Sequence, residues 1–305
     1  MAESLSVLTS ARYGKDKVRV LRVVREGGWH HVVEYNVCAL LEGEIDISYT
    51  KSDNSVIVAT DSIKNITYYI AKISPHILIP ERFALHLGTH LVSRYKHIHK
   101  ASVEVEQLRW TRIRVPVQGG GSVDEDHPHA FFRDGDEKRF VKVEIDGSAG
   151  KDKLVGRVTA GLTDLLVLKS TGSNFEGFIR DKYTTLKEVD DRIFSTSVDL
   201  NYHFGDIALP VPADEDKIVF DIPTGPDAGS GTVWDETVPA RARRLTLEVF
   251  ARDDSASVQV GATLYKMAQL LIAQNDGINS VQYALPNKHF IPVDMNYIGI
   301  DNLTP

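Results

Sequence analysis

The stretch FSTSVDLNYHF (residues 194–204) alternates apolar and polar side chains along its whole length. Phe194, Val198 and Tyr202 stand among the apolar positions, and Asp199 and His203 among the polar ones. Successive side chains of a strand point to opposite faces of a sheet. The pattern therefore predicts a strand with one buried and one polar face, which is typical of antiparallel sheets.

Outward from this strand, the same order of elements occurs twice: two strands, two helices, two strands. In the first half, strands are predicted over 18–24 and 31–44, helices from Thr60 and Pro80, and strands over 103–115 and 140–146. In the second half, strands are predicted over 165–170 and 194–204, helices over 238–249 and 264–271, and strands over 281–285 and 291–295. Grouped helices between strands predict an α+β fold, with helices packed on one face of an antiparallel sheet.

The two halves meet near GSAGKD (147–152), so we predict one domain over 1–148 and a second over 149–305. Residues 118–126 and 213–232 are rich in Gly, Asp or Pro and are expected to form exposed loops.

Composition excludes several classes of protein. The net charge is −7 without a basic run, which argues against a nucleic-acid partner. No apolar run is long enough to span a membrane, and the N-terminus lacks the pattern of a secretory signal. Cys38 is the one cysteine, so an intrachain disulfide is impossible. We expect an intracellular protein.

The residues Thr60-Asp61-Ser62 raise a specific question, because all three favour the start of a helix and one cap would suffice. A helix start offers free N–H donors and a partial positive charge, which suit an anion. A capped surface helix is the more common explanation.

A second unusual segment is LVLKSTGSNFEGFIRDKYTTLKEVDDRI (166–193), in which a buried strand ends in small polar residues. Phe175 could form a stacking platform there, and Arg192 a planar fork for adjacent acceptor atoms. A polar turn with an isolated aromatic residue is the ordinary alternative.

Three further residues could take part in such a site, and each also has a purely structural explanation. Gln259 could bind an amide-like edge, His289 could act as a base or proton relay, and Lys15 could act as a base. The pairs His97/His99 and His127/His129 suggest zinc, but a third ligand is not evident, so we predict no metal. The sequence contains no nucleotide-binding glycine pattern and no Cys-x-x-Cys motif, so its motifs indicate no organic cofactor.

Taken together, these segments resemble the urate oxidase (uricase) family. The resemblance lies in YGKDKVRV, LLEGEIDISYTKSDNSVIVATDSIKN, LGTHLVSRYKHIH, LTDLLVLKSTGSNFEGFIRDKYTTLKEVDDRIFSTSVD, SASVQ with LYKMA, and YALPNKHF, which span nearly the whole chain. It implies two tandem tunnelling-fold domains and a homotetramer whose sheets join into a β-barrel, with active sites at subunit interfaces. It also implies oxidation of urate by O₂ and water to 5-hydroxyisourate and hydrogen peroxide, without metal or organic cofactor. The compartment that it suggests is the peroxisome; otherwise we expect the cytoplasm.

Site residues follow from the resemblance position by position. Phe175 resembles the stacking platform, and Arg192 and Gln259 resemble two tweezers that hold opposite edges of the purine. The backbone N–H of Val258 would add a contact. Thr60 and Asp61 would come from a neighbouring subunit and offer backbone donors to the imidazole side of urate.

The resemblance also implies a proton relay of Lys15, Thr60 and His289. Asn287 and Thr60 would flank the pocket for O₂ or water above the ring.

The sequence departs from the family in two places. Val260-Gly261 are two extra residues behind Gln259, and we expect them to bulge outward and leave the glutamine in place. The chain also stops at Asp301-Asn302-Leu303-Thr304-Pro305, where family members usually continue, often to a peroxisomal tripeptide, so we expect a truncated C-terminal segment. Two alternatives stay open: a tunnelling-fold enzyme acting on a pterin, and a catalytically silent purine-binding protein.

Overall fold

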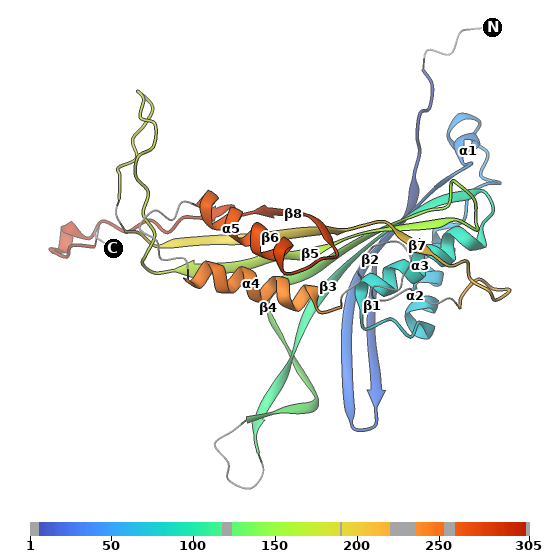
Figure 1. The fold of residues 1–305 in the computed structure, drawn as a ribbon, viewed down its shortest axis with the longest axis horizontal. Coiled ribbons are helices and arrows are strands. Elements are labelled where there is room, and N and C mark those ends of the chain that lie inside the picture. Colours follow the sequence, from blue (N-terminus) through green and yellow to red (C-terminus); the bar gives the residue numbers. More distant parts are fainter. Residues whose placement is uncertain (1–5, 118–123, 190, 220–235, 253–259, 303–305) are drawn as a thin grey trace. The chain divides into compact units, whose positions relative to one another are not determined.

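The computed structural model describes residues 6–117, 124–189, 191–219, 236–252 and 260–302 (Figure 1). The chain forms two compact units. Unit 1 comprises residues 1–160 and 203–236, and unit 2 comprises 161–202 and 237–305. The strands β5 (Leu154–Lys169) and β6 (Phe194–Phe204) have residues in both units. The domain boundary between residues 148 and 149 stays a prediction.

Unit 1 is built on an antiparallel sheet in which neighbours along the chain pair in sequence. Its strands are β1 (Tyr13–Glu26), β2 (Trp29–Gly43), β3 (Ile98–Pro116), β4 (Asp124–Asp146), the first part of β5, and β7 (Ile207–Leu209). The predicted hairpin between β1 and β2 is confirmed, because Glu26 pairs with Trp29 across the turn. Gly27 adopts a φ of 61°, which glycine tolerates without strain.

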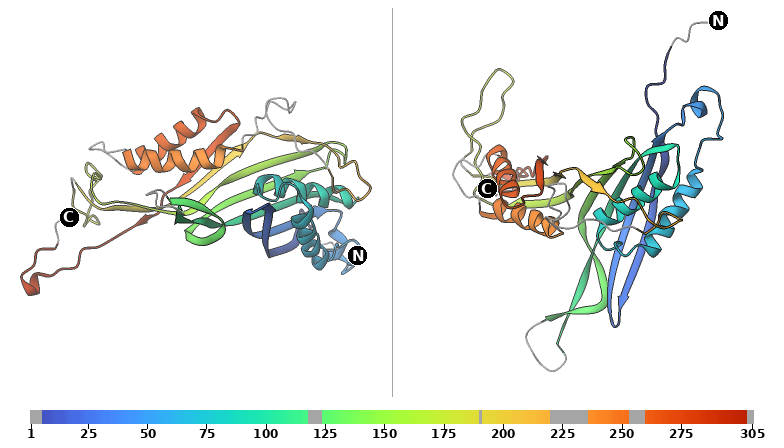
Figure 2. Two further views of the ribbon diagram at one scale, coloured as in Figure 1. Left: turned by 90° about the horizontal axis from the view of Figure 1, so that it is seen from below. Right: turned by 45° about the vertical axis from the view of Figure 1, so that its right-hand side comes forward.

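Two helices, α2 (Thr60–Ile73) and α3 (Pro80–Arg94), lie against one face of this sheet, as Figures 1 and 2 show. A short helix, α1 (Asp46–Thr50), precedes them. Phe83, Leu87 and Leu91 of α3 are fully buried, as their four-residue spacing predicts. Phe83 stacks on Tyr35 of β2 with ring centroids 5.6 Å apart, so helix and sheet share one core.

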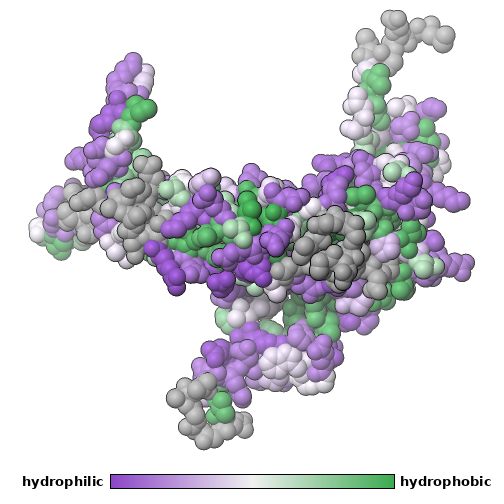
Figure 3. Space-filling view, viewed as in Figure 1, coloured by the Kyte–Doolittle hydropathy of each residue, from purple (hydrophilic) through white to green (hydrophobic). Residues whose placement is uncertain are grey.

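The far parts of β3 and β4 extend beyond the helix-covered sheet, and their surface is largely hydrophilic in Figure 3. Arg109 of β3 forms ion pairs with Asp134 at 3.0 Å and with Glu137 at 2.7 Å. The expected loop over 118–126 is therefore partly wrong, because β4 begins at Asp124. Cross-strand pairing outweighs the polar composition there. Residues 118–123 lie outside the described residues.

Unit 2 contains the rest of β5, most of β6, β8 (Ile278–Ala284) and β9 (Asn287–Lys288), together with the helices α4 (Val238–Arg252) and α5 (Val260–Ala273). The alternation in β6 is confirmed, because Val198 and Leu200 are fully buried and Tyr202 nearly so. Phe250 of α4 packs against Phe194 with ring centroids 5.7 Å apart. The helices of this unit thus lie on the buried face of its strands (Figure 2).

Two local predictions in unit 2 are wrong. Residues 291–295 form no strand, and the Ile291 side chain is 84% exposed. Alternation alone is insufficient, because strand backbone groups need a neighbouring strand as partner. Pro286-Asn287 do not form the predicted turn either, since Asn287 belongs to β9 and pairs with Thr196 of β6.

The described helices include none that is long and apolar enough to cross a membrane.

Candidate functional site

The predicted site residues fall into two groups. Lys15, Thr60 and Asp61 belong to unit 1. The second group, in unit 2, consists of Phe175, Arg192, Asn287 and His289. Val258 and Gln259 lie outside the residues that the structure describes.

Lys15 lies within β1, at an irregularity of the pairing with β2 between Lys15 and Val18. Lys17 has a φ of 55°, so the strand changes direction immediately after Lys15. The preceding Gly14 has no room for a side chain, because a Cβ there would lie 1.9 Å from the carbonyl oxygen of Ala39. The sequence Gly14-Lys15 is thus held tightly against β2.

Tyr13 links this part of β1 to the segment before α2. Its hydroxyl oxygen accepts a hydrogen bond from the backbone N–H of Val58 at 2.7 Å. Burial raises the pKa of Tyr13, so the hydroxyl stays neutral. Tyr13 precedes Lys15 by two residues and Val58 precedes Thr60 by two, so this bond connects the two parts of the unit 1 group.

The start of α2 is open. The predicted capping by Thr60, Asp61 or Ser62 is wrong, because the helix has Ala59 at its N-cap and no side chain caps it. The first hydrogen bond of the helix runs from the N–H of Ile63 to the carbonyl of Ala59 at 3.1 Å. The N–H groups of Thr60 and Asp61 precede that bond, at the positive end of the helix dipole.

The Asp61 carboxylate points along the helix instead. It accepts hydrogen bonds from Lys64 at 2.6 Å and from Asn65 at 2.9 Å. These contacts, above all the one with Lys64, lower the pKa of Asp61, and the nearby Lys15 ammonium adds to the effect. Lys15 and the start of α2 are therefore close enough to interact electrostatically.

In unit 2, a two-stranded contact brings Phe175 close to Arg192. The N–H of Phe175 donates to the carbonyl of Val189 at 2.8 Å, and the N–H of Val189 donates back at 3.2 Å. The Arg192 guanidinium lies over the Phe175 ring, 5.0 Å from its centroid. The predicted pair is thus together in space, although 16 residues separate the two positions along the chain.

The Arg192 guanidinium has no acceptor among the residues that the structure describes, and its Nε is buried without a hydrogen-bond partner. Burial lowers the pKa of Arg192, but arginine remains charged at any physiological pH. A partly buried cation without a counter-ion is costly, and it suits an anionic ligand.

The Phe175 ring accepts a flat partner. The ring of Phe178 stacks on it, with centroids 4.9 Å apart and planes inclined by 17°. This near-parallel arrangement is the geometry that a planar heterocycle would use on the same ring.

Asn287 lies in β9, the short strand after β8, and His289 directly follows it. β9 pairs with the start of β6, the strand that begins two residues after Arg192. The carbonyl of Pro286 accepts hydrogen bonds from the Thr196 hydroxyl at 3.1 Å and from the N–H of Ser197 at 3.2 Å. Both side chains of interest are exposed. The four described residues of the unit 2 group therefore gather around the first part of β6.

The extra residues Val260-Gly261 do not bulge outward as expected. They form the first turn of α5, which begins at Val260. The two residues therefore continue into α5 as helix.

The His-x-His pairs have other neighbours in the described part of the chain. His97 contacts the carbonyl of Val56 at 2.8 Å, and His99 contacts the Glu44 carboxylate at 3.1 Å. The rings of His127 and His129 meet edge to face at 4.5 Å. Within the described residues, no three metal-ligating side chains gather around one point.

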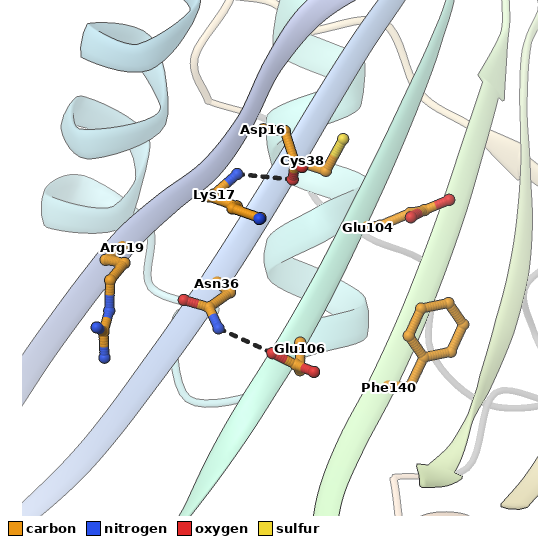
Figure 4. A pocket seen from close by; sticks show the side chains of 8 residues that line it. All are labelled: Asp16, Lys17, Arg19, Asn36, Cys38, Glu104, Glu106 and Phe140. Carbon is orange, nitrogen blue, oxygen red and sulfur yellow. Dashed lines mark hydrogen bonds between the residues drawn. The ribbon is translucent and has the colours of Figure 1, made fainter.

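The face of the unit 1 sheet that turns away from the helices holds a cavity of about 480 Å³ (Figure 4). It is lined by Asp16, Lys17, Arg19, Asn36, Cys38, Glu104, Glu106 and Phe140. Burial raises the pKa of Cys38 to about 11, so the thiol is no nucleophile at neutral pH. Acidic and basic side chains are mixed there, and no predicted site residue lines this cavity.

Two residues that the sequence analysis missed support the predicted ones. Tyr13 holds the segment before α2, and Asp191 accepts hydrogen bonds from four donors around Arg192. Both stand next to predicted residues, in ARYGKDKV and DDRI. Their partners are mostly backbone amides distant in sequence, which no motif reports.

A family model and several known proteins match this chain over almost its whole length. The family model Uricase matches residues 11–144 and 158–304. The uricase of Aspergillus flavus is 44% identical over 295 residues, which cover 96% of this chain and 88% of that protein. The uricase of Schizosaccharomyces pombe is 41% identical over 99% of this chain and 92% of its own length.

The fold agrees as well. The crystal structure of uricase from Arthrobacter globiformis superimposes with a TM-score of 0.77 at 33% identity, over 98% of this chain and 88% of that chain. The predicted class of antiparallel sheets with helices on one face, the tunnelling fold, is confirmed by this match. The family model, the relatives and the fold all point the same way: this chain belongs to the uricase family.

Proposed function

We propose that this chain oxidises urate with O₂ and water to 5-hydroxyisourate and hydrogen peroxide. The observation that carries the proposal is the Arg192 guanidinium, which lies over the Phe175 ring without an acceptor in the described chain. A flat, anionic heterocycle would satisfy both groups at once. Membership of the uricase family names urate as that heterocycle.

Urate would take the stacking position that Phe178 occupies on the Phe175 ring. The Arg192 fork would then donate two charge-assisted hydrogen bonds to acceptors on one side of the purine. Gln259 and the N–H of Val258 would bind the other side, as the family resemblance implies. A ring held along two edges and one face has little freedom to rotate.

The start of α2 would supply the remaining donors. The open N–H groups of Thr60 and Asp61, at the positive end of the helix dipole, would face the imidazole side of urate. We propose that they come from a second copy of the chain in a homotetramer. Joining the sheets of several copies into a barrel would also protect the strand edges.

Proton transfer would involve Lys15, Thr60 and His289. In the balanced reaction, urate gives two electrons to O₂ and the oxygen of water becomes the hydroxyl on carbon 5. The displaced protons complete hydrogen peroxide. Asn287 and Thr60 would flank the position of O₂ or water above the ring, and the relay would remove and return protons there.

No metal or organic cofactor takes part in the proposed reaction, because an electron-rich urate anion can itself reduce O₂. The peroxisome is the compartment that the family resemblance suggests. The protein's contribution would then be binding, orientation and proton handling.

The test uses purified protein and urate in air, with a chelator and no added metal. We expect urate absorbance to fall while hydrogen peroxide accumulates in equal amount. Binding without oxidation would indicate a silent purine-binding protein. Turnover of a pterin but not of urate would indicate a different tunnelling-fold enzyme, and loss of activity under chelation would contradict the cofactor-free reaction.

A further inference from the structure

Asp191, which precedes Arg192, joins two segments of unit 2 through its carboxylate. One oxygen, Oδ1, accepts hydrogen bonds from the N–H groups of Gly172 at 2.8 Å, Ser173 at 3.4 Å and Arg192 at 2.9 Å. The other oxygen, Oδ2, accepts from the Thr171 hydroxyl at 2.5 Å. The residue thus ties the turn after β5 to the start of β6.

These two segments are the ends of the stretch that carries Phe175 and Arg192. Ser173, two residues before Phe175, is 2% exposed, so the turn is packed as well as hydrogen bonded. The paired amides of Phe175 and Val189 form a second tie inside the first. A shift at Asp191 would therefore move the phenyl ring relative to the guanidinium.

The four hydrogen bonds of the Asp191 carboxylate leave the Arg192 guanidinium available to a ligand. Its oxygens are directed at three N–H groups and a hydroxyl, and not at the guanidinium of the next residue. The hydrogen bonds, first among them the one from Thr171, lower the pKa of Asp191, so it stays ionised at neutral pH. An acid next to the cation thus does not neutralise it by direct pairing.

We propose that Asp191 is a positioning residue of the purine site, which holds the Phe175 ring and the Arg192 guanidinium in register through the geometry of its four hydrogen bonds. This inference rests on the proposed function. It assigns the role to the position of the carboxylate oxygens rather than to their charge.

Two conservative variants separate geometry from charge. Asp191→Asn keeps the Oδ1 acceptor for three N–H groups, and its amide can donate to the Thr171 hydroxyl, but the charge is lost. Asp191→Glu keeps the charge but moves the oxygens by one methylene. Asp181→Ala is the matched control, because Asp181 bonds only locally, to Tyr183 and Thr184, among the residues of the same loop.

The measurements are KM and kcat for urate in air, and urate binding with O₂ excluded. We expect Asp191→Glu to weaken binding and raise KM roughly 10-fold or more, because small displacements are costly in a preorganised site. Asp191→Asn should stay within about 3-fold of the parent, since it keeps the positions of the four hydrogen bonds and loses their charge assistance, and Asp181→Ala should match the parent. kcat should change less than KM in Asp191→Glu, because the Asp191 carboxylate bonds to none of the relay residues Lys15, Thr60 and His289.

The opposite order, with Asp191→Asn impaired and Asp191→Glu near the parent, would overturn the inference by showing that charge matters. Parent-like binding in both variants would overturn it too. A parent protein that neither binds nor oxidises urate would instead refute the proposed function. Melting temperatures of all variants show whether a change in KM arises from a folded protein.

Discussion

At the scale of single residues, the charged groups of the candidate site differ in the hydrogen-bond acceptors and neighbouring charges around them. Arg192 has a ring beneath it and no acceptor among the described residues, whereas Arg180 in the same loop donates to the carbonyl of Leu186 at 2.8 Å. The Lys15 ammonium helps to lower the pKa of Asp61 at the start of α2. Arg192 and Lys15 are therefore the residues whose removal tests the proposed binding and proton transfer.

Arg192→Ala should weaken urate binding by about 2–4 kcal/mol, because it removes a charged, two-pronged donor. Gln259→Ala should cost less, roughly 1–3 kcal/mol, since it removes a neutral pair. Titration of urate without O₂ measures both, with Arg180→Ala as the control that should bind like the parent. Equal affinity in the parent and in Gln259→Ala would mean that the inserted Val260-Gly261 keep the glutamine away from the ring.

Lys15→Met should reduce turnover far more than urate binding, because it removes proton handling and leaves the contacts along the purine edges. Steady-state kinetics and anaerobic binding separate the two effects. Lys17→Met, on the neighbouring part of β1, should keep both. Collapsed binding with unchanged turnover in Lys15→Met would show that the lysine holds the substrate instead.

At the scale of elements, hydrophobic periodicity predicted the parts that pack on a neighbour. The alternation in β6 and the four-residue spacing in α3 are confirmed because those side chains face a core. The strand over 291–295 has the same alternation without a pairing partner among the described strands, so it fails. Periodicity describes which face is apolar, but it cannot say whether a partner exists.

The local details of the site were less predictable than its residues. The residue types of Thr60, Asp61 and Ser62 indicated a side-chain cap at the start of the helix. In the structure, no side chain caps the first backbone N–H groups of α2. Phe175 and Arg192 were suggested by their residue chemistry and assigned by a family resemblance, but the contact between them depends on the Asp191 and Val189 hydrogen bonds. Such bonds join distant backbone groups and leave no repeating pattern in the sequence.

Gly14→Ala should destabilise the fold by about 2 kcal/mol or more, because its Cβ would overlap the carbonyl oxygen of Ala39 in the next strand. Gly28→Ala is the matched control, since nothing lies within 4 Å of a Cβ at that position. Urea unfolding of both variants measures the difference. Equal stability would show that β1 can shift away from β2 at little cost.

α3 should make stability depend on pH. His86 is buried and neutral, with Nε2 donating to the carbonyl of Ile218 and Nδ1 bonded to the Ser74 hydroxyl at 2.8 Å. Burial lowers the pKa of His86 to about 4, and it also lowers that of His90. An unfolded histidine titrates near 6.5, so below that pH the unfolded chain binds protons that the folded chain does not.

Stability should therefore be full above about pH 6.5 and should fall as the pH drops towards 4, by roughly 3 kcal/mol or less for His86. Urea unfolding between pH 7.5 and 4.5 measures the slope. His86→Gln should lower stability at neutral pH and flatten the slope. An unchanged slope in that variant would assign the acid sensitivity to other groups.

At the scale of the whole molecule, the candidate residues are divided between two compact units of the chain. Lys15 and Thr60 belong to unit 1, and Phe175 and Arg192 to unit 2. We propose that urate is oxidised where unit 1 of one copy meets unit 2 of another. A site shared in this way can be reassembled from two different defective chains.

The most direct measurement is therefore urate oxidation by mixed assemblies of Lys15→Met and Arg192→Ala chains, co-expressed with different tags and purified through both. Each variant alone should be nearly inactive. Random assembly gives a shared site both intact halves in about a quarter of cases, so the mixture should recover about a quarter of the parent activity. Mixed assemblies as inactive as the separate variants would contradict a site shared between copies.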